Sequence, residues 1–188
     1  LSIMDELIAE MDRRYKLFAE ESVEDLFEYN RGHKRSMLPV LWLFHDEIAD
    51  WTRDKDYNRE FTAKMTILAT KVRAAGIFLV LIAQRSDKDV LPMQVRDNLG
   101  NRLALKLETE ASSKIALDKS GAELLLGKGH LAARIGSSIT YAQCAFLDSA
   151  QAEQAAKAIT ADYDEITINC QNSFPSWRVR LVTAEKLG

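Results

Sequence analysis

An apolar segment of the chain, residues 38–44, leads through His45 to two adjacent carboxylates, Asp46 and Glu47. An apolar strand that ends in Asp-Glu is the pattern of a Walker B element. In such an element, Asp46 would hold Mg²⁺ through water, and Glu47 would orient the water that attacks the γ-phosphate of ATP. A simpler interpretation stays open, in which both carboxylates cap the turn that follows the strand.

A second apolar segment, residues 77–83, is followed by Gln84. The amide of Gln84 suits a sensor that hydrogen-bonds the γ-phosphate or the attacking water, but a polar residue that simply ends a strand fits the spacing equally well. Ligands of α/β sheets bind at the carboxyl ends of parallel strands. We therefore expect Gln84 to lie at the same edge of a sheet as Asp46 and Glu47.

The elements that must position these residues can be predicted from hydrophobic spacing. Both apolar segments are typical of strands buried on both faces, and residues 61–72 repeat apolar side chains at helical spacing up to a stop at Gly76. Strand, helix and strand form a right-handed parallel unit. An amphipathic helix over residues 5–19 is expected to pack on this sheet, and Ser22 is expected to cap a short helix that runs to Tyr29.

The second half of the chain has shorter elements. Residues 1–165 are predicted to form one domain, and residues 166–188 a tail or an edge strand. The expected elements are a strand over 102–107, a helix over 108–117 that begins near Thr109, a short helix capped by Ser120 that ends at Gly127-Lys128-Gly129, a β-hairpin of 130–134 and 138–146 around Gly136-Ser137, and an Ala-rich helix over 150–161.

Composition excludes several classes of protein. With 188 residues, of which 47% are apolar and 28% charged, the chain is globular, and its net charge of −3 argues against a surface that is basic throughout. Its 8 glycines and 3 prolines favour long regular elements over a β-sandwich. Two cysteines and three dispersed histidines predict neither a disulfide framework nor a zinc site. The apolar segments are too short to span a bilayer, so a cytoplasmic location is expected.

The sequence has no Gly-x-x-x-x-Gly-Lys-Ser/Thr loop, and Gly127-Lys128-Gly129 does not replace it. That loop cradles the phosphates with backbone N–H groups and a lysine. The chain is therefore expected to be the second half of an ATPase core and to be inactive in isolation.

Several motifs follow one another in a characteristic order. They are residues 10–15 (Glu-Met-Asp-Arg-Arg-Tyr), 38–50 with Asp46-Glu47 and Ala49-Asp50, 72–77 (Val-Arg-Ala-Ala-Gly-Ile), 83–85 (Ala-Gln-Arg), 101–104 (Asn-Arg-Leu-Ala), 112–114 (Ser-Ser-Lys) and 121–129. Over residues 5–160 this order resembles the C-terminal half of the motor domain of FtsK/SpoIIIE-type DNA translocases. The resemblance implies an α/β fold, a partial RecA-like P-loop NTPase core whose parallel sheet is flanked by helices and followed by a β-hairpin and a helix. It also implies ATP and Mg²⁺ as cofactors, a homo-hexameric ring, and ATP-driven movement along double-stranded DNA.

The resemblance assigns roles to single residues. Asp46 and Glu47 match the Walker B pair, and Gln84 matches the sensor at the strand end. Arg73 matches the arginine that a subunit presents to its neighbour's nucleotide, where a cation stabilises the charge of the phosphoryl-transfer transition state. An arginine that simply complements the dipole at the end of its helix fits the same spacing.

The basic residues expected to contact the DNA backbone are Arg85 and Lys114. The chain departs from the family pattern here, because Glu110 occupies the first basic position of the stretch that ends with Lys114. A carboxylate at that position repels phosphate and weakens the case for a DNA grip there. Other departures are His45 before the acidic pair and Ser86 after Gln-Arg.

Three functional hypotheses follow from this pattern. The leading one is a DNA translocase of chromosome partitioning or of conjugative and mobile-element DNA transfer, whose parent protein reaches the membrane through segments outside this chain. The second is a motor that moves proteins, as the related ring ATPases of type VII secretion do, for which Glu110 is acceptable. The third is a non-catalytic subunit with a degenerate site.

Overall fold

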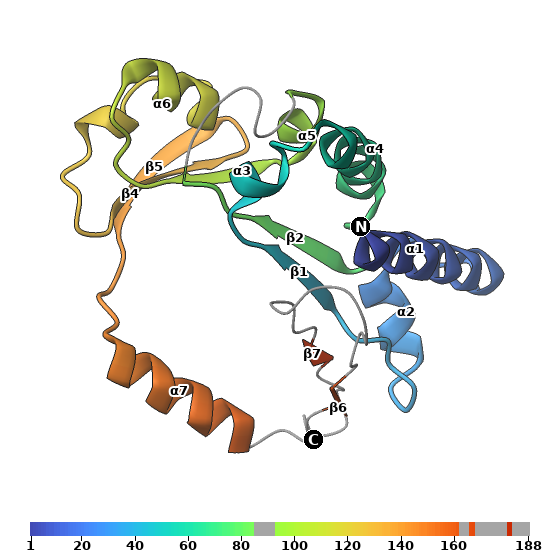
Figure 1. Cartoon of the computed structure of the whole chain (residues 1–188). Helices are drawn as coiled ribbons and strands as arrows, with labels where there is room; N and C mark the ends of the chain where they lie inside the picture. The colour runs from blue at the N-terminus through green and yellow to red at the C-terminus, as the bar shows by residue number, and fades with distance from the viewer. Residues whose placement is uncertain (85–92, 162–165, 168–179, 182–188) are drawn as a thin grey trace.

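The computed structural model describes residues 1–84, 93–161, 166–167 and 180–181. Its first half is built on two parallel strands, β1 (Leu41–His45) and β2 (Ile77–Leu81), which are connected by α3 (Ile48–Trp51) and α4 (Lys55–Lys71). This is the parallel unit that the sequence predicted. Figure 1 shows the N-terminal helix α1 (Ser2–Glu21) beside α4, next to the two strands.

The helices and strands of this half enclose one apolar core. Helix α4 begins six residues before its first core residue because Asp54 caps it, accepting hydrogen bonds from the N–H groups of Asp56 and Tyr57. The completely buried side chains of α4 meet those of α1 and β2, and this burial supplies most of the stabilisation. The core residues are Met4, Met11, Ile48, Ala49, Phe61, Met65, Leu68, Val72, Ala75, Ile77 and Val95.

The short helix α2 (Leu26–Gly32) forms as expected, but the prediction that Ser22 caps it is wrong. Ser22 is the left-handed residue that ends α1, with a φ of 55°. The cap is Asp25, whose carboxylate accepts the N–H of Glu28, while the carboxylate of Glu28 accepts the N–H of Glu24. The reciprocal capping pattern therefore lies three residues further along the chain than predicted.

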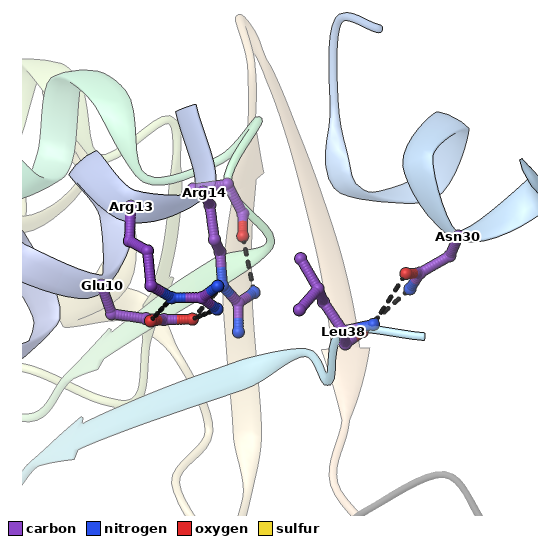
Figure 2. A network of polar contacts seen from close by, with 6 residues as sticks. Glu10, Arg13, Arg14, Asn30 and Leu38 are labelled. Atoms are coloured by element: carbon purple, nitrogen blue, oxygen red, sulfur yellow. Dashed lines mark hydrogen bonds and ion pairs between the residues drawn. The ribbon is translucent and has the colours of Figure 1, made fainter. Parts of the chain in front are cut away.

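Strand β1 begins three residues later than the sequence predicted, because the preceding backbone has other partners. The side-chain amide of Asn30 donates to the carbonyl of Leu38 and accepts from its N–H, both at 2.8 Å (Figure 2). Pro39 has no N–H to offer to a neighbouring strand. The N–H of Leu41 is the first to reach the second segment, donating to the carbonyl of Gly76.

The prediction that both faces of β1 are buried is also wrong for the part of the chain that the structure describes. Leu43 and His45 point into the core, whereas Trp42 and Phe44 on the opposite face are each 56% exposed. Trp42 stacks on Phe78 of β2 with ring centroids 4.8 Å apart. One face of the strand pair thus carries an exposed aromatic surface.

The second half contains an antiparallel sheet of three strands, ordered β3 (Asn101–Ala104), β4 (His130–Ile135) and β5 (Ser138–Gln143). The predicted hairpin is confirmed as β4 and β5, and the predicted third strand pairs with this hairpin rather than with β1 or β2. Helix α6 (Glu110–Leu117) and the 3₁₀ turn η1 (Ala122–Leu124) lie between β3 and β4 in the sequence. The sheet, α6 and η1 enclose a small core of Ala104, Leu117, Ala122, Leu125 and Ala132.

Of the two helix caps predicted in this half, one is confirmed and one is wrong. Thr109 caps α6 as expected, since its hydroxyl accepts the N–H of Ser112. Ser120 does not cap the next turn, because Gly121 occupies the cap position without a side chain. Glu123 is instead bonded to the N–H of Gly121 and to the hydroxyl of Ser113.

The remaining described elements are α5 (Met93–Asn98), α7 (Ser149–Ala161), and a short antiparallel pair, β6 (Ile166–Thr167) and β7 (Arg180–Leu181). Helix α7 confirms the predicted Ala-rich helix. The domain boundary at residue 165 and the assignment of 166–188 as a tail stay predictions. Among the described helices, none is long and apolar enough to cross a membrane.

Gly76, which leads into β2, gives the first testable prediction. Its φ is +70°, and a Cβ atom there would overlap the side chain of the fully buried Leu26. Gly76→Ala should lower the free energy of unfolding by about 1–2 kcal/mol through the positive φ and by a further ~1–3 kcal/mol through overpacking. Urea denaturation followed by circular dichroism measures this loss.

The hairpin glycine provides a matched control. Gly136 also has a positive φ, of +60°, but no atom lies within 4 Å of its added Cβ. Gly136→Ala should therefore show the loss of about 1–2 kcal/mol that the backbone conformation alone causes. Equal losses for the two variants would contradict the packing between Gly76 and Leu26.

Candidate functional site

The two strands end together, as the sequence predicted. His45 and Leu81 are the last paired residues of the parallel register. Beyond them the N–H of Ile82 donates to the carbonyl of His45 at 2.9 Å, and the N–H of Ile48 donates to the carbonyl of Ile82 at 3.1 Å. These two bonds hold the segment with Asp46 and Glu47 against the segment that leads to Gln84. The segments that carry these three residues therefore leave the sheet at one edge, where β1 and β2 end (Figure 1).

Asp46 is the first residue after β1, and it is exposed. Its Oδ1 accepts the N–H of Glu47 at 2.9 Å, which orients the carboxylate. The other carboxylate oxygen has no hydrogen bond within the described part of the chain. A carboxylate held in this way at a sheet edge can bind a hydrated divalent cation.

Glu47 has two unusual features. Its backbone is left-handed, with φ 47° and ψ 58°, which is costly for a residue with a Cβ atom. Its side chain is half-buried, and Oε2 is buried without a hydrogen-bond partner among the described residues. A buried and unbonded carboxylate oxygen is unfavourable in a resting fold.

His45, which the sequence showed only as a departure from the family pattern, belongs to the core beneath this pair. It is 1% exposed, packs edge-on against Phe61 with a centroid distance of 5.4 Å, and places Nε2 3.3 Å from the hydroxyl of Tyr57. Burial lowers the pKa of the imidazole. The residue is thus a neutral packing group at neutral pH, and it connects the end of β1 to α4.

Two further residues were predicted near the end of β2, Gln84 and Arg85. Gln84 is exposed, three residues after the end of β2. Arg85, predicted to contact DNA, lies outside the described residues. Gln84, the predicted sensor, therefore lies in the segment that follows β2, and its position relative to the γ-phosphate stays a prediction.

Arg73 lies in the turn between α4 and β2, and its side chain is exposed. No ion pair joins it to another residue in the described part of the chain. Helix α1 reaches this turn, since a guanidinium nitrogen of Arg14 donates to the carbonyl of Ala75 at 2.8 Å. Figure 2 shows this bond together with Glu10, which pairs with Arg13 and Arg14. The motif at residues 10–15 was noticed in the sequence, but its contact with the turn was not predicted.

Lys114 does not lie near the ends of β1 and β2. It lies on helix α6, which packs with the antiparallel sheet of the second half. Its ammonium nitrogen lies 2.7 Å from a carboxylate oxygen of Glu110, and both side chains are well exposed. The hydrogen bond and charge of Glu110 raise the pKa of Lys114. The lysine expected to contact DNA is thus paired with the carboxylate that departs from the family pattern.

The carboxylates at this sheet edge can be compared with what a hydrated metal ion requires. No group of three or more His, Cys, Asp or Glu side chains that could hold a metal occurs among the described residues. One carboxylate that binds Mg²⁺ through water needs no such cluster, because Mg²⁺ keeps most of its waters and binds the phosphates directly. The exposed carboxylate of Asp46 fits that requirement.

Comparison with known proteins decides the family. The model of the FtsK/SpoIIIE family matches residues 1–135, which include every element from α1 through β4. The chain belongs to the FtsK/SpoIIIE family. This confirms the resemblance found in the sequence.

Curated members of the family have recognisable similarity. The protein named DNA translocase FtsK of Caldanaerobacter subterraneus subsp. tengcongensis is 34% identical over 129 residues, which are 69% of this chain and 18% of that protein. The protein of the same name from Listeria monocytogenes is 34% identical over 161 residues, 80% of this chain and 21% of that protein. The chain spans about a fifth of the length of these relatives.

Solved structures share the fold. The conjugation coupling protein TcpA of pCW3, solved with ATPγS, superimposes with a TM-score of 0.74 at 23% identity, over 84% of this chain and 48% of TcpA. The cytoplasmic domain of the type VII secretion ATPase EccC of Thermomonospora curvata gives a TM-score of 0.65 at 19% identity, over 78% of this chain and 17% of EccC. The expected α/β ATPase fold is confirmed by these likenesses.

The strain at Glu47 gives a testable prediction about stability. Glu47→Gly should raise the free energy of unfolding by about 1 kcal/mol, since glycine tolerates a left-handed backbone and the buried, unbonded carboxylate oxygen is removed. Glu47→Ala removes the carboxylate but keeps the strain, so it should gain less. Urea denaturation of the three proteins measures the order. A glycine variant less stable than the alanine variant would contradict the backbone geometry at this position.

Proposed function

We propose that this chain is part of the ATP-hydrolysing motor of a protein that moves double-stranded DNA. The observation that carries the proposal is the position of Asp46 and Glu47 at the carboxyl end of β1, beside the end of β2. Membership of a family whose curated relatives are named DNA translocases supports the choice of DNA as cargo.

The proposed chemistry is the hydrolysis of ATP with Mg²⁺. The metal ion would neutralise charge on the phosphates, and Asp46 would hold one of its waters. Glu47 would orient the attacking water with its carboxylate, whose Oε2 has no hydrogen-bond partner among the described residues. Gln84 would hydrogen-bond the γ-phosphate or that same water from the neighbouring strand end.

Arg73 is the proposed contribution of each subunit to its neighbour's nucleotide in a homo-hexameric ring. Its exposure, and the lack of an ion pair to any other described residue, leave the guanidinium available to another chain. A cation supplied in trans stabilises the transition-state charge and accelerates phosphoryl transfer by about 10³–10⁵-fold.

The names of the similar proteins point to more than one kind of DNA movement. The structural neighbour TcpA is named a conjugation coupling protein, which supports conjugative DNA transfer, while the relatives named DNA translocase FtsK support movement along DNA in general. Arg85 and Lys114 are the proposed contacts to the DNA backbone.

One observation favours a second candidate, a motor that moves proteins. The ion pair between Lys114 and Glu110 cancels the positive charge that a DNA grip at α6 requires. A structural neighbour is named a type VII secretion ATPase. The two candidates differ in whether long duplex DNA stimulates hydrolysis.

Glu47→Gln in the full-length protein tests the proposed reaction. The amide keeps the shape but cannot act as a base toward water, so ATP hydrolysis should fall by about 10²-fold or more. A coupled ATPase assay with and without long duplex DNA measures this, and the stimulation by DNA should fade as salt rises.

The matched control is Asp56→Asn. Asp56 is an exposed acid on α4 that pairs with Arg59 at 3.6 Å and does not lie at a strand end. This variant should keep its hydrolysis rate. Hydrolysis by Glu47→Gln at the unchanged rate would overturn the proposal, and hydrolysis indifferent to DNA would favour the protein-moving motor. No hydrolysis by the unmodified protein would favour the non-catalytic subunit.

A charge change on α6 tests the DNA contact. Glu110→Lys removes the partner of Lys114 and adds a cation, so affinity for duplex DNA should rise and the slope of log affinity against log salt should steepen by about 1 or more. Glu153→Lys is the control, because Glu153 and Lys157 form an equivalent exposed ion pair, at 2.6 Å, on α7. Equal effects of the two substitutions would show that α6 makes no specific contact with DNA.

A further inference from the structure

We infer that Arg14, held by Glu10, is a positioning residue that fixes the turn carrying Arg73, with Tyr15 as a second anchor. The inference rests on the proposed role of Arg73 toward a neighbouring subunit. It gives a function to the Glu-Met-Asp-Arg-Arg-Tyr motif of α1, which the proposed reaction leaves unexplained.

The backbone of the turn is unusually well bonded. Each of the six carbonyl groups from Lys71 to Gly76 accepts a hydrogen bond, and the donors come from α1, α2, β1, β2 and the turn itself. The donors, in chain order of the carbonyls, are the hydroxyl of Tyr15, the N–H groups of Ile77, Gly76 and Leu26, a guanidinium nitrogen of Arg14, and the N–H of Leu41.

Two of these donors are side chains of α1. The hydroxyl of Tyr15 donates to the carbonyl of Lys71 at 2.6 Å, and Nη1 of Arg14 donates to the carbonyl of Ala75 at 2.8 Å. The two carbonyls flank Arg73 at either end of the turn. Helix α1 therefore fixes both sides of the residue proposed to act in trans.

The side chain of Arg14 is buried and bonded at both ends of its guanidinium group. Its side chain is 1% exposed, and its Nε donates to Glu10 at 2.7 Å while Nη1 reaches the turn (Figure 2). Burial acts to raise the pKa of Glu10, but the hydrogen bonds and charges of Arg13 and Arg14 lower it overall. Glu10 is therefore a carboxylate at neutral pH and compensates the buried guanidinium. A lysine has no second nitrogen that could span the two partners.

The result is a rigid backbone that carries a free side chain. The carbonyls around Arg73 are all bonded, whereas its guanidinium is exposed. A group that must reach another subunit's phosphate works best from a backbone that does not have to reorganise, and a misplacement of about 1 Å can reduce a rate by about 10²-fold.

Arg13 supplies the matched control. It also pairs with Glu10, with its Nε at 2.6 Å, but it is half exposed, and no bond from it to the turn is present in the described structure. Arg14→Lys and Tyr15→Phe change contacts with the turn, whereas Arg13→Lys changes only the outer half of the ion pair.

The experiment uses the full-length protein and two measurements. Hydrogen exchange reports on the turn through the amides of Gly76 and Ile77, which bond to carbonyls within it. Arg14→Lys should speed their exchange by about tenfold or more and lower kcat by about 10–100-fold with a smaller change in KM for ATP. Arg13→Lys should leave both unchanged, and Tyr15→Phe should show a smaller effect in the same direction.

Mixing of subunits separates a trans defect from general damage. Subunits with Glu47→Gln cannot activate water but still present an intact Arg73, whereas Arg14→Lys subunits have the converse defect. A mixture of the two should hydrolyse ATP faster than the sum of the separate proteins. Arg73→Ala mixed with Glu47→Gln is the reference for a defect that acts in trans.

Three results would overturn the inference. One is a normal kcat and normal exchange for Arg14→Lys. Another is a reduced kcat that mixing does not rescue although Arg73→Ala is rescued, which would place the defect of Arg14→Lys elsewhere. The third is a failure to rescue Arg73→Ala itself, which would overturn the proposed trans role of Arg73 and with it the purpose assigned to Arg14.

Discussion

The parallel pairing of β1 with β2 is the constraint on which the rest of the structure depends. Because the two strands run in the same direction and in register from Leu41–Ile77 to His45–Leu81, the residues that follow them must emerge at one edge. Two backbone hydrogen bonds continue the pairing past the strands and draw Ile48 and Ile82 together. Asp46 and Glu47 are thereby fixed beside the segment that leads to Gln84, and Glu47 adopts a left-handed backbone that only such a fixed connection maintains.

The same pairing also determines the other end of the unit. A parallel connection needs a helix that returns the chain, and the turn from α4 into β2 must then meet the start of β1. In this protein that turn carries Arg73, and it is held by α1, α2 and β1 at once. The acidic pair and the arginine therefore lie at opposite ends of the strands. This arrangement suits a ring in which each subunit offers one end to its own nucleotide and the other to its neighbour's.

Much of this could be predicted from the sequence, because apolar runs, helical spacing and Gly76 mark the parallel unit strongly. The emergence of Asp46, Glu47 and the segment that leads to Gln84 at one sheet edge followed from topology alone. What could not be predicted depends on long-range partners. The bonds of Asn30 to Leu38 delay β1, Asp25 replaces Ser22 as a cap, and Arg14 reaches a carbonyl 61 positions away. The exposure of Trp42 and Phe44 depends on which elements cover a sheet face, which an apolar run does not specify. Helical spacing predicts that Lys114 lies beside Glu110. It does not predict whether the motor moves DNA or protein.

If Asp46 and Glu47 drive movement along DNA, displacement of a third strand measures that movement directly. The full-length protein is mixed with long duplex DNA that carries a labelled triplex-forming oligonucleotide, and release of the label is followed after ATP is added. A motor of this kind should release the label rapidly with ATP, and not at all with a non-hydrolysable analogue or with Glu47→Gln. Hydrolysis of ATP at a normal rate on the same DNA without release of the oligonucleotide would contradict the role of Asp46 and Glu47 in that movement.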